Sequence, residues 1–314
     1  MWMIILGDSM LVRLGYVAIS TAIDVTSSSP YTYSEYLNKC NIDKLDDVIK
    51  SNLLGLEEIL KYNVKNNIHF YRMSSKIIPL ATKDGVEFNY TTEYKEYYDR
   101  ISKIIKDNNL RVDFHPDQFC VLNSTNNDVV KNSIKILEYH YYLLNMMMVK
   151  DKVLILHVGS NVFGKDNSIK RFINNFNKLP EYLKKCIVIE NDDKIFNVSD
   201  VLKISEDINI PVVLDYHHYN CNKSTIDIEK IFNTWNITPK IHFSSPKNKK
   251  EFRSHSDYIN SDDFINFIES IKKYNTDVDI MLEAKMKDDA LFRLVRELKY
   301  KTNYRFIDDT SFEV

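Results

Sequence analysis

Eight short runs rich in β-branched and aromatic residues recur along the whole sequence, and helix-like stretches separate them. These stretches carry apolar residues at i, i+3 and i+4 spacing, which indicates one buried face on each helix. This alternation predicts an α/β fold. The predicted strands are Arg13–Ile19, Ile68–Ser75, Arg111–His115, Val153–Gly159, Ile187–Asn191, Pro211–His218, Lys240–Ser244 and Asp279–Lys285. The predicted helices are Leu45–Tyr62, Glu93–Lys106, Val129–Met147, Ile169–Leu183, Val198–Ile208, Phe264–Lys273 and Ala290–Lys299.

Several strand cores, VLILHV, IVIE and PVVLD, are nearly continuous hydrophobic runs. Such runs are typical of parallel strands that are covered on both faces. Eight strand and helix units within 314 residues, without a Pro/Gly/Ser-rich linker, favour a single-domain (β/α)8 TIM barrel. A doubly wound open sheet is the alternative, although no GxGxxG or P-loop motif follows any strand. We expect the barrel over residues 13–300, an N-terminal extension or strand lead-in at 1–12, and a C-terminal tail at 301–314.

Charge and cysteine content narrow the expected partners and the compartment. The formal net charge is −2, so any charge that binds DNA has to be local or supplied by metal ions. The four cysteines form no CxxC pair, and we therefore expect no disulfide framework. The apolar opening is too short for a membrane span and lacks the features of a signal peptide. We expect an intracellular protein, cytoplasmic in a prokaryotic or viral setting, with no membrane partner.

Histidines and carboxylates fall where the predicted strands end. In a closed barrel all strands point the same way, so their carboxyl ends meet at one rim, where barrel enzymes hold their active sites. A lone strand-end histidine is more often a hydrogen-bonded structural residue. Eight such groups packed together would repel one another or stay unsatisfied without a cation among them. The eight candidates are His115, His157, Glu190, Asp215, His218, His242, His255 and Glu283.

These residue types predict a metal centre. Imidazole and carboxylate ligands without cysteine favour Mn²⁺, Zn²⁺ or Fe²⁺ over Mg²⁺ alone. Eight ligands exceed the needs of one ion, so we expect two or three. Ions spaced about 3.5–4 Å apart are the usual apparatus for hydrolysing phosphodiesters.

Three other histidines are interpreted differently. His140 falls inside a predicted helix and His69 begins the second strand, so both are expected to be structural. Alternation along the sixth strand should turn only one of His217 and His218 inward, and His218 is the expected partner of Asp215.

Nine segments, in consistent order from about Arg13 to Glu297, resemble the ultraviolet damage endonucleases. They are RLGY, YRMSS, HPDQFCVLNS, LHVGS, IENDD, LDYHH, KIHFSS, SHSDYI and MLEAKMKD. One segment alone is weakly specific, but nine in order are highly specific. The resemblance implies a barrel related to that of the apurinic endonucleases and a cut immediately 5′ to a lesion, leaving a 3′-hydroxyl and a 5′-phosphate. Family members act on cyclobutane dimers, 6-4 photoproducts and often abasic sites.

The resemblance also implies the chemistry of the site. The family's metal ligands correspond to the same eight rim candidates, and the ions would be Mn²⁺, with Zn²⁺, Co²⁺ or Mg²⁺ as alternatives. Lys240 corresponds to a lysine beside the metals that is sometimes carboxylated. Glu190, Lys240, His242 and Glu283 would be the catalytic residues. Water held by the ions would attack the phosphorus, and the ions and Lys240 would stabilise the developing charge.

Damaged double-stranded DNA would be the partner, bound by a monomer. Gln118 and Phe119 correspond to a family pair that fills the space vacated by the damaged bases. The family usually has tyrosine at the second position, so stacking would survive here without the hydroxyl's hydrogen bond. Tyr16 corresponds to a tyrosine that contacts DNA near the lesion, and an ordinary half-buried barrel tyrosine is the alternative. Lys285 is placed to contact the DNA backbone.

Two other functions are compatible with this pattern. A metal-dependent sugar isomerase or epimerase uses similar ligands on the same rim, but it needs no apolar wedge after the third strand. A non-catalytic damage-binding protein would carry a degenerate metal site, whereas the set of ligand residues is intact here. Nicking of irradiated plasmid with added Mn²⁺ would separate the three.

Overall fold

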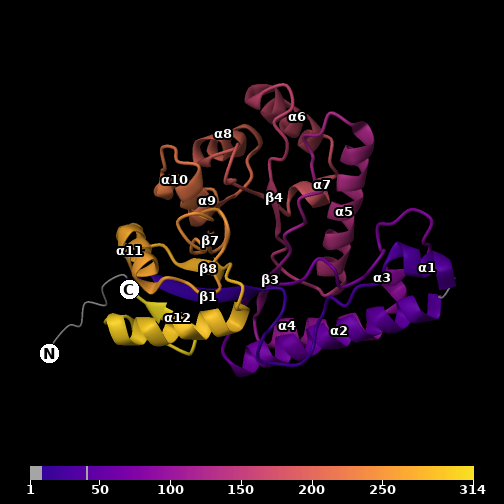
Figure 1. The fold of residues 1–314 in the computed structure, drawn as a ribbon, viewed down its shortest axis with the longest axis horizontal. Helices are drawn as coiled ribbons and strands as arrows, with labels where there is room; N and C mark the ends of the chain where they lie inside the picture. The colour runs from indigo at the N-terminus through magenta and orange to yellow at the C-terminus, as the bar shows by residue number, and fades with distance from the viewer. Residues whose placement is uncertain (1–8, 40–41) are drawn as a thin grey trace.

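The computed structural model describes residues 9–39 and 42–314, and its strands form a ring surrounded by helices (Figure 1). Eight parallel strands follow one another in the order β3-β2-β1-β8-β7-β6-β5-β4. A parallel bridge between Phe114 and Leu154 joins the two outer strands and nearly closes the ring. The predicted TIM barrel is therefore confirmed.

The elements follow the predicted alternation. The parallel strands are β1 (Leu11–Val17), β2 (Phe70–Arg72), β3 (Arg111–Asp113), β4 (Leu154–His157), β5 (Ile187–Glu190), β6 (Val212–Asp215), β7 (Lys240–Phe243) and β8 (Val278–Leu282). The longer helices are α2 (Ile42–Lys65), α4 (Lys95–Asp107), α5 (Asn127–Met146), α6 (Lys165–Asn177), α8 (Val198–Ile208), α11 (Ser261–Ile271) and α12 (Lys287–Lys301). The shorter elements are α1 (Tyr33–Lys39), α3 (Tyr90–Glu93), α7 (Glu181–Lys184), α9 (Tyr216–Cys221), α10 (Ile228–Asn233) and the 3₁₀ turn η1 (Lys272–Tyr274).

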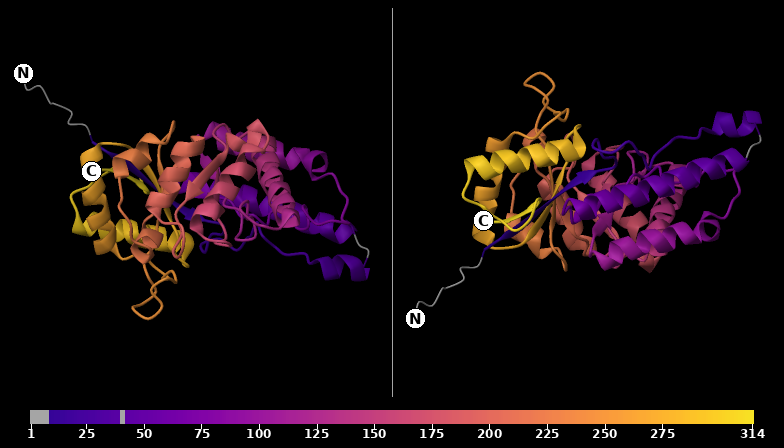
Figure 2. Two further views of the ribbon diagram at one scale, coloured as in Figure 1. Left: turned by 90° about the horizontal axis from the view of Figure 1, so that it is seen from above. Right: turned by 90° about the horizontal axis from the view of Figure 1, so that it is seen from below.

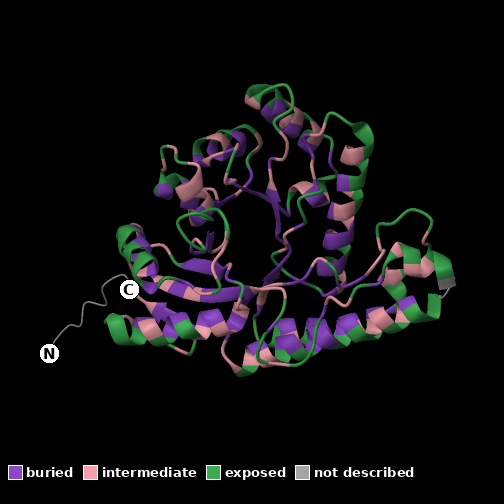
Figure 3. Cartoon of the chain, in the orientation of Figure 1, coloured by how far each residue is buried: buried purple, intermediate pink, exposed green. Residues whose placement is uncertain are grey.

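Helix α2 shows why the helices pack on the strands. Its buried residues recur every three or four positions, from Leu45 and Ile49 to Leu56 and Ile59, so one apolar face meets the barrel. Both views of Figure 2 show α1 at the outer edge of the molecule, away from the ring of strands. Figure 3 shows that the strands inside the molecule are buried, whereas the exposed residues lie on the outward faces of the helices.

The sixth strand is shorter than predicted, because β6 ends at Asp215 and α9 begins at the next residue. The Asp215 carboxylate caps this helix by accepting a hydrogen bond from the backbone N–H of His218 at 2.6 Å. Strand alternation therefore does not choose between His217 and His218, and our reason for preferring His218 was wrong. One helical turn sets its ring beside Asp215 instead.

The C-terminal segment is part of the sheet, whereas we expected a tail from residue 301. It forms β9 (Arg305–Phe306) and β10 (Ser311–Glu313), and β10 pairs antiparallel with β1 in the register Val12↔Phe312. Phe312 is fully buried and stacks on Tyr304 with ring centroids 5.2 Å apart. Apolar side chains of this segment pack against the rest of the protein, which its position at the end of the sequence did not lead us to expect. The barrel also begins two residues earlier than expected, at Leu11, and residues 1–8 of the expected extension lie outside the described part.

A small apolar cluster of side chains on or directly beside β4, β5 and β6 packs with the indole of Trp235. Among the described residues, none of the helices has the length and apolar character that crossing a bilayer requires.

Candidate metal centre

Strand register brings the predicted rim residues together at the carboxyl end of the barrel. His157 ends β4 directly beside Glu190, which ends β5. Asp215 ends β6 and is paired in the same way with His242 of β7. The other four candidates, His115, His218, His255 and Glu283, lie in the segments that follow β3, β6, β7 and β8.

Glu190 lies at the centre of this cluster. Its two carboxylate oxygens are 2.9 Å from Nε2 of His115 and 2.8 Å from Nδ1 of His242. His157 and His218 approach the same carboxylate to 3.8 and 3.6 Å. Four imidazoles from four different segments therefore surround one buried acid.

Three overlapping sets of residues each place three ligand atoms within 4.8 Å of one another. The first set joins Glu190 to two histidines, the second joins Glu190 to Asp215, and the third joins Asp215 to Glu283. The sets are His115, His157 and Glu190; Glu190, Asp215 and His218; and Asp215, His242 and Glu283. His255 lies at the margin, with Nδ1 3.8 Å from a Glu283 oxygen.

Burial controls the protonation of the cluster. It lowers the pKa of His115 to about 4 and lowers the pKa of His157, so both rings are neutral at pH 7. It raises the pKa of Asp215 to about 7 and also raises the pKa of Glu190. Burial opposes the charged form of His218 as well, but the carboxylates of Asp215 and Glu190 outweigh it and raise the pKa of this ring to about 9. Neutral imidazoles are the form that binds metals, and a metal ion can replace the protons that this cluster otherwise holds.

Backbone carbonyls orient two of the histidines. Nδ1 of His115 is 3.0 Å from the Pro116 carbonyl, and Nδ1 of His218 is 3.0 Å from the Asn191 carbonyl. A carbonyl can only accept, so Nδ1 carries the proton in each ring. For neutral His115, Nε2 is then an acceptor facing a Glu190 oxygen, and a proton or a cation has to lie between these two acceptors. Metal-binding histidines are commonly held this way by the nitrogen that does not bind the metal.

Unsatisfied atoms support the same interpretation. Within residues 9–39 and 42–314, Oδ2 of Asp215 and Nδ1 of His157 are buried and have no hydrogen-bond partner. Such atoms are costly unless something else satisfies them. Imidazole and carboxylate donors, three overlapping sets and unpaired ligand atoms together fit divalent metal ions.

Lys240 lies two residues before His242 on β7 and is fully buried. Its ammonium pairs with Asp113 and lies over the Phe70 ring, 4.9 Å from the centroid. Burial lowers the pKa of Lys240 to about 7 even though Asp113 opposes this shift. The structure thus places the predicted lysine beneath the cluster, where it is paired with an acid.

Gln118 and Phe119, the pair predicted to fill the space vacated by damaged bases, lie in the loop after β3, on the same rim as the cluster. Gln118 is exposed, and 70% of Phe119 is accessible to solvent. The Phe119 backbone N–H donates to the Asp117 side chain at 2.8 Å, which fixes the turn that presents the ring. Lys285 is also exposed beside this rim, with its ammonium 3.7 Å from Asp257.

Tyr16 does not reach the surface, contrary to our expectation of a DNA contact. Its side chain is fully buried, and its hydroxyl donates to Oδ1 of Asn63 in α2 at 2.8 Å. The ring lies 5.1 Å from that of Tyr71. The alternation of β1 therefore turns this side chain towards the helix layer, and the interpretation as a packed barrel tyrosine is the one that the structure supports.

The remaining histidines have structural partners. His217 is buried in α9, and its Nε2 is 3.3 Å from the Arg253 carbonyl. Nδ1 of His140 donates to the Ile136 carbonyl within α5, and Nε2 of His69 is 2.8 Å from Asp308.

Sequence reasoning missed Arg72, the last residue of β2. Its guanidinium donates to Oε1 of Glu283 at 2.6 Å and lies 2.6 Å from Nε2 of His242. The signal was available, because Arg72 ends a strand as the other rim residues do. A guanidinium is not a metal ligand, however, so Arg72 does not share the chemistry that marks the other strand ends.

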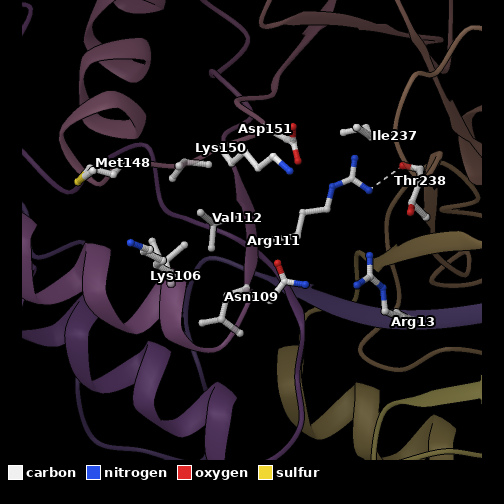
Figure 4. Close-up of a pocket in the computed structure, with 13 residues that line it drawn as sticks. Arg13, Lys106, Asn109, Arg111, Val112, Met148, Lys150, Asp151, Ile237 and Thr238 are labelled. Atoms are coloured by element: carbon white, nitrogen blue, oxygen red, sulfur yellow. Dashed lines mark hydrogen bonds between the residues drawn. The ribbon is translucent and has the colours of Figure 1, made fainter.

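A cavity lies at the opposite, amino end of the strands (Figure 4). It has a volume of about 260 Å³, and Arg13 and Arg111 line it. Both guanidinium groups bind Asp279, at 2.6 Å in each case, and Arg111 also donates to the Thr238 carbonyl. At this end the barrel is closed by an ion-pair network, which leaves the carboxyl end as the candidate site.

Comparison with known proteins extends these observations. The model of the family described as UV-endonuclease UvdE matches residues 12–312. The UV DNA damage endonuclease of Bacillus cereus strain B4264 is 40% identical over 301 residues, which cover 92% of this chain and 95% of the relative. The crystal structure of SacUVDE superposes with a TM-score of 0.85 at 35% identity, covering 92% of this chain and 98% of that one. Endonuclease IV from Thermus thermophilus superposes with a TM-score of 0.58 at 10% identity, over 92% and 100% of the two chains, which shows a shared fold alone.

Proposed function

Since the chain belongs to the UV-endonuclease UvdE family, as its nine segments predicted, we propose that it is a metal-dependent DNA repair endonuclease. It nicks the damaged strand immediately 5′ to cyclobutane dimers and 6-4 photoproducts, and also at abasic sites, and leaves a 3′-hydroxyl and a 5′-phosphate. It acts as a monomer on double-stranded DNA inside the cell.

One observation carries this proposal: eight candidate ligand side chains from six strand ends gather at one rim, seven of them in three overlapping sets and His255 at the margin. These residues would hold divalent ions, which we propose to be two or three Mn²⁺ with Zn²⁺, Co²⁺ or Mg²⁺ as alternatives, and such ions would supply water activation and charge stabilisation for phosphodiester hydrolysis. Glu190, His242 and Glu283 are the proposed catalytic residues, and they would position these ions.

Several side chains prepare the site before substrate arrives. His115 and His218 are fixed by backbone carbonyls, so the ligand atoms need little reorganisation. Lys240 is buried two residues before His242 and pairs with Asp113, and in its protonated form it would favour the negative charge that develops on the phosphate.

Lesion recognition is assigned to Gln118 and Phe119. Two damaged bases have to leave the stack to be examined, and filling the vacated space offsets an unstacking cost of a few kcal/mol. An exposed phenylalanine on the rim of the cluster has the size and apolar surface for this role. Lys285 is assigned to the DNA backbone.

The proposal is tested with supercoiled plasmid, irradiated or unirradiated, in buffer with added Mn²⁺. We expect relaxed circles only from irradiated plasmid, and we expect DNA polymerase to extend the new ends directly because they carry a 3′-hydroxyl. Retention of irradiated plasmid without nicking would indicate a damage-binding protein instead. Conversion of a ketose with no effect on plasmid would indicate an epimerase.

A further inference from the structure

The guanidinium of Arg72 is bonded to two of the proposed metal ligands. We propose that Arg72 competes with a divalent ion for His242 and Glu283, and that metal binding at this end of the cluster moves Arg72 towards Asp113. The inference rests on the proposed metal-dependent function and assigns to Arg72 a positioning and regulatory role within that site.

The contacts of Arg72 are short and largely hidden from solvent. Only 11% of its side chain is exposed. Nη1 donates to Oε1 of Glu283 at 2.6 Å, and Nη2 lies 2.6 Å from Nε2 of His242. The same two residues, together with Asp215, form the third set of ligand atoms. The guanidinium therefore contacts two of the three residues that an ion in this set would use.

The imidazole of His242 can serve only one of the two cations. Nη2 of Arg72 lies 2.6 Å from Nε2 and 3.4 Å from Nδ1 of His242, so the guanidinium sits against this ring, while Nδ1 is 2.8 Å from Glu190. A guanidinium only donates, so it can contact this ring only where the ring offers an acceptor. An ion bound to either ring nitrogen would place a second positive charge beside the guanidinium. We therefore expect metal binding at His242 to displace the contact seen here.

A second position for the guanidinium lies close by. Nε of Arg72 and Oδ1 of Asp113 are 3.9 Å apart. Within the described ranges, each of these atoms is buried and lacks a hydrogen-bond partner. The other Asp113 oxygen is held by Lys240. A small rotation of Arg72 would satisfy both unpaired atoms and release Glu283 and His242.

This arrangement has two consequences for metal binding. Arg72 neutralises Glu283 and keeps the third set assembled before an ion enters. It also lowers the affinity of the third set for an ion, because part of the binding free energy is used to displace the guanidinium. One ion of the cluster is therefore expected to bind more weakly than its ligands alone would allow.

The test compares the wild type with Arg72→Gln, Arg72→Lys and a control, Arg100→Gln. Arg100 also donates to a carboxylate, Glu57 at 2.8 Å, but it does so on α4, outside the cluster. Proteins freed of metal with EDTA are titrated with Mn²⁺, and electron paramagnetic resonance of free Mn²⁺ counts the ions bound. We expect the weakest ion to bind about tenfold more tightly in Arg72→Gln. We expect a smaller gain in Arg72→Lys, which keeps the charge but cannot reach both partners, and no change in the control.

Thermal unfolding adds a readout that does not depend on counting ions. In EDTA we expect Arg72→Gln to melt below the wild type, because Glu283 loses its cation, and we expect saturating Mn²⁺ to close most of that gap. Mn²⁺ affinity that is unchanged or lower in the Arg72 variants would overturn the inference, and Arg72→Lys decides if Arg72→Gln does not fold. A wild type that binds no Mn²⁺ would overturn the proposed function as well, whereas equal binding by wild type and variants would remove only the role of Arg72.

Discussion

Glu190 is the residue on which the proposed chemistry depends most. Its carboxylate contacts His115 and His242 directly and belongs to two of the three ligand sets. Replacing it with glutamine keeps the shape but removes the charge that two ions would share. We expect Glu190→Gln to lower the rate of nicking of irradiated plasmid by about a thousandfold or more while leaving damaged-DNA binding within about threefold.

The matched control for that variant is Glu251→Gln, which removes an exposed carboxylate that pairs with Lys247. It should nick at the wild-type rate. Nicking by Glu190→Gln at the control's rate would show that the cluster is not the catalytic centre.

Gln118 and Phe119 give a second prediction at this scale. Replacing both with alanine removes the wedge but none of the proposed metal ligands, so discrimination should suffer more than chemistry. We expect affinity for irradiated duplex to fall about tenfold, since one stacking contact contributes about 1–3 kcal/mol. Gel-shift titrations of irradiated and unirradiated duplex measure this difference. Tyr300→Ala, which removes an aromatic residue that is 91% exposed on α12, serves as the control. An unchanged preference for irradiated duplex in the double variant would remove the probing role.

Prediction from sequence succeeded for residues whose position follows from strand ends. All eight rim candidates lie in one cluster, although their roles as ligands stay proposals. The DNA contact of Tyr16 was expected from the family resemblance, and the structure instead buries this side chain against Asn63 of α2, as in the alternative of a packed barrel tyrosine. Arg72 also ends a strand, but its contacts with two distant residues, Glu283 and His242, become visible only in the structure.

At the scale of elements, β10 is the addition that the sequence did not suggest. Phe312 from this strand is fully buried against Tyr304 and pairs in register with Val12 of β1. Phe312→Ala should therefore lower the free energy of unfolding by about 3–5 kcal/mol, the usual cost of deleting a buried phenylalanine side chain. Denaturant titration measures this cost.

Ile307→Ala is the control for that variant, because Ile307 is 53% exposed in the turn between β9 and β10. Its effect should stay within about 0.5 kcal/mol. Equal, small effects for both variants would mean that residues 305–313 behave as a tail after all.

Element boundaries explain which parts of the fold were predictable. Strands with continuous apolar cores, such as β4 and β5, were placed within a few residues. The end of β6 was not, because a single side chain, Asp215, stops the strand by capping α9. Short helices such as α9 and α10 carry too few residues for a helical period to be recognised.

At the scale of the whole molecule, the barrel separates two kinds of polar cluster. At the amino end, Arg13 and Arg111 both pair with Asp279, so this carboxylate is neutralised within the protein. At the carboxyl end, buried acids and neutral imidazoles outnumber the cations, and the proposed divalent ions would complete the site. A net charge of −2 is then compatible with DNA binding, because the ions would concentrate positive charge where the phosphate has to bind.

The most direct test of this account is removal of the metal from the intact protein. The chain is dialysed against EDTA, and nicking of irradiated plasmid and thermal unfolding are measured before and after Mn²⁺ is restored. We expect EDTA to abolish nicking and to lower the melting temperature by several degrees, and we expect Mn²⁺ to reverse both changes, since ions bound only by the folded state stabilise it. Undiminished nicking in excess EDTA, with an unchanged melting temperature, would contradict the claim that the eight side chains assemble around shared divalent ions.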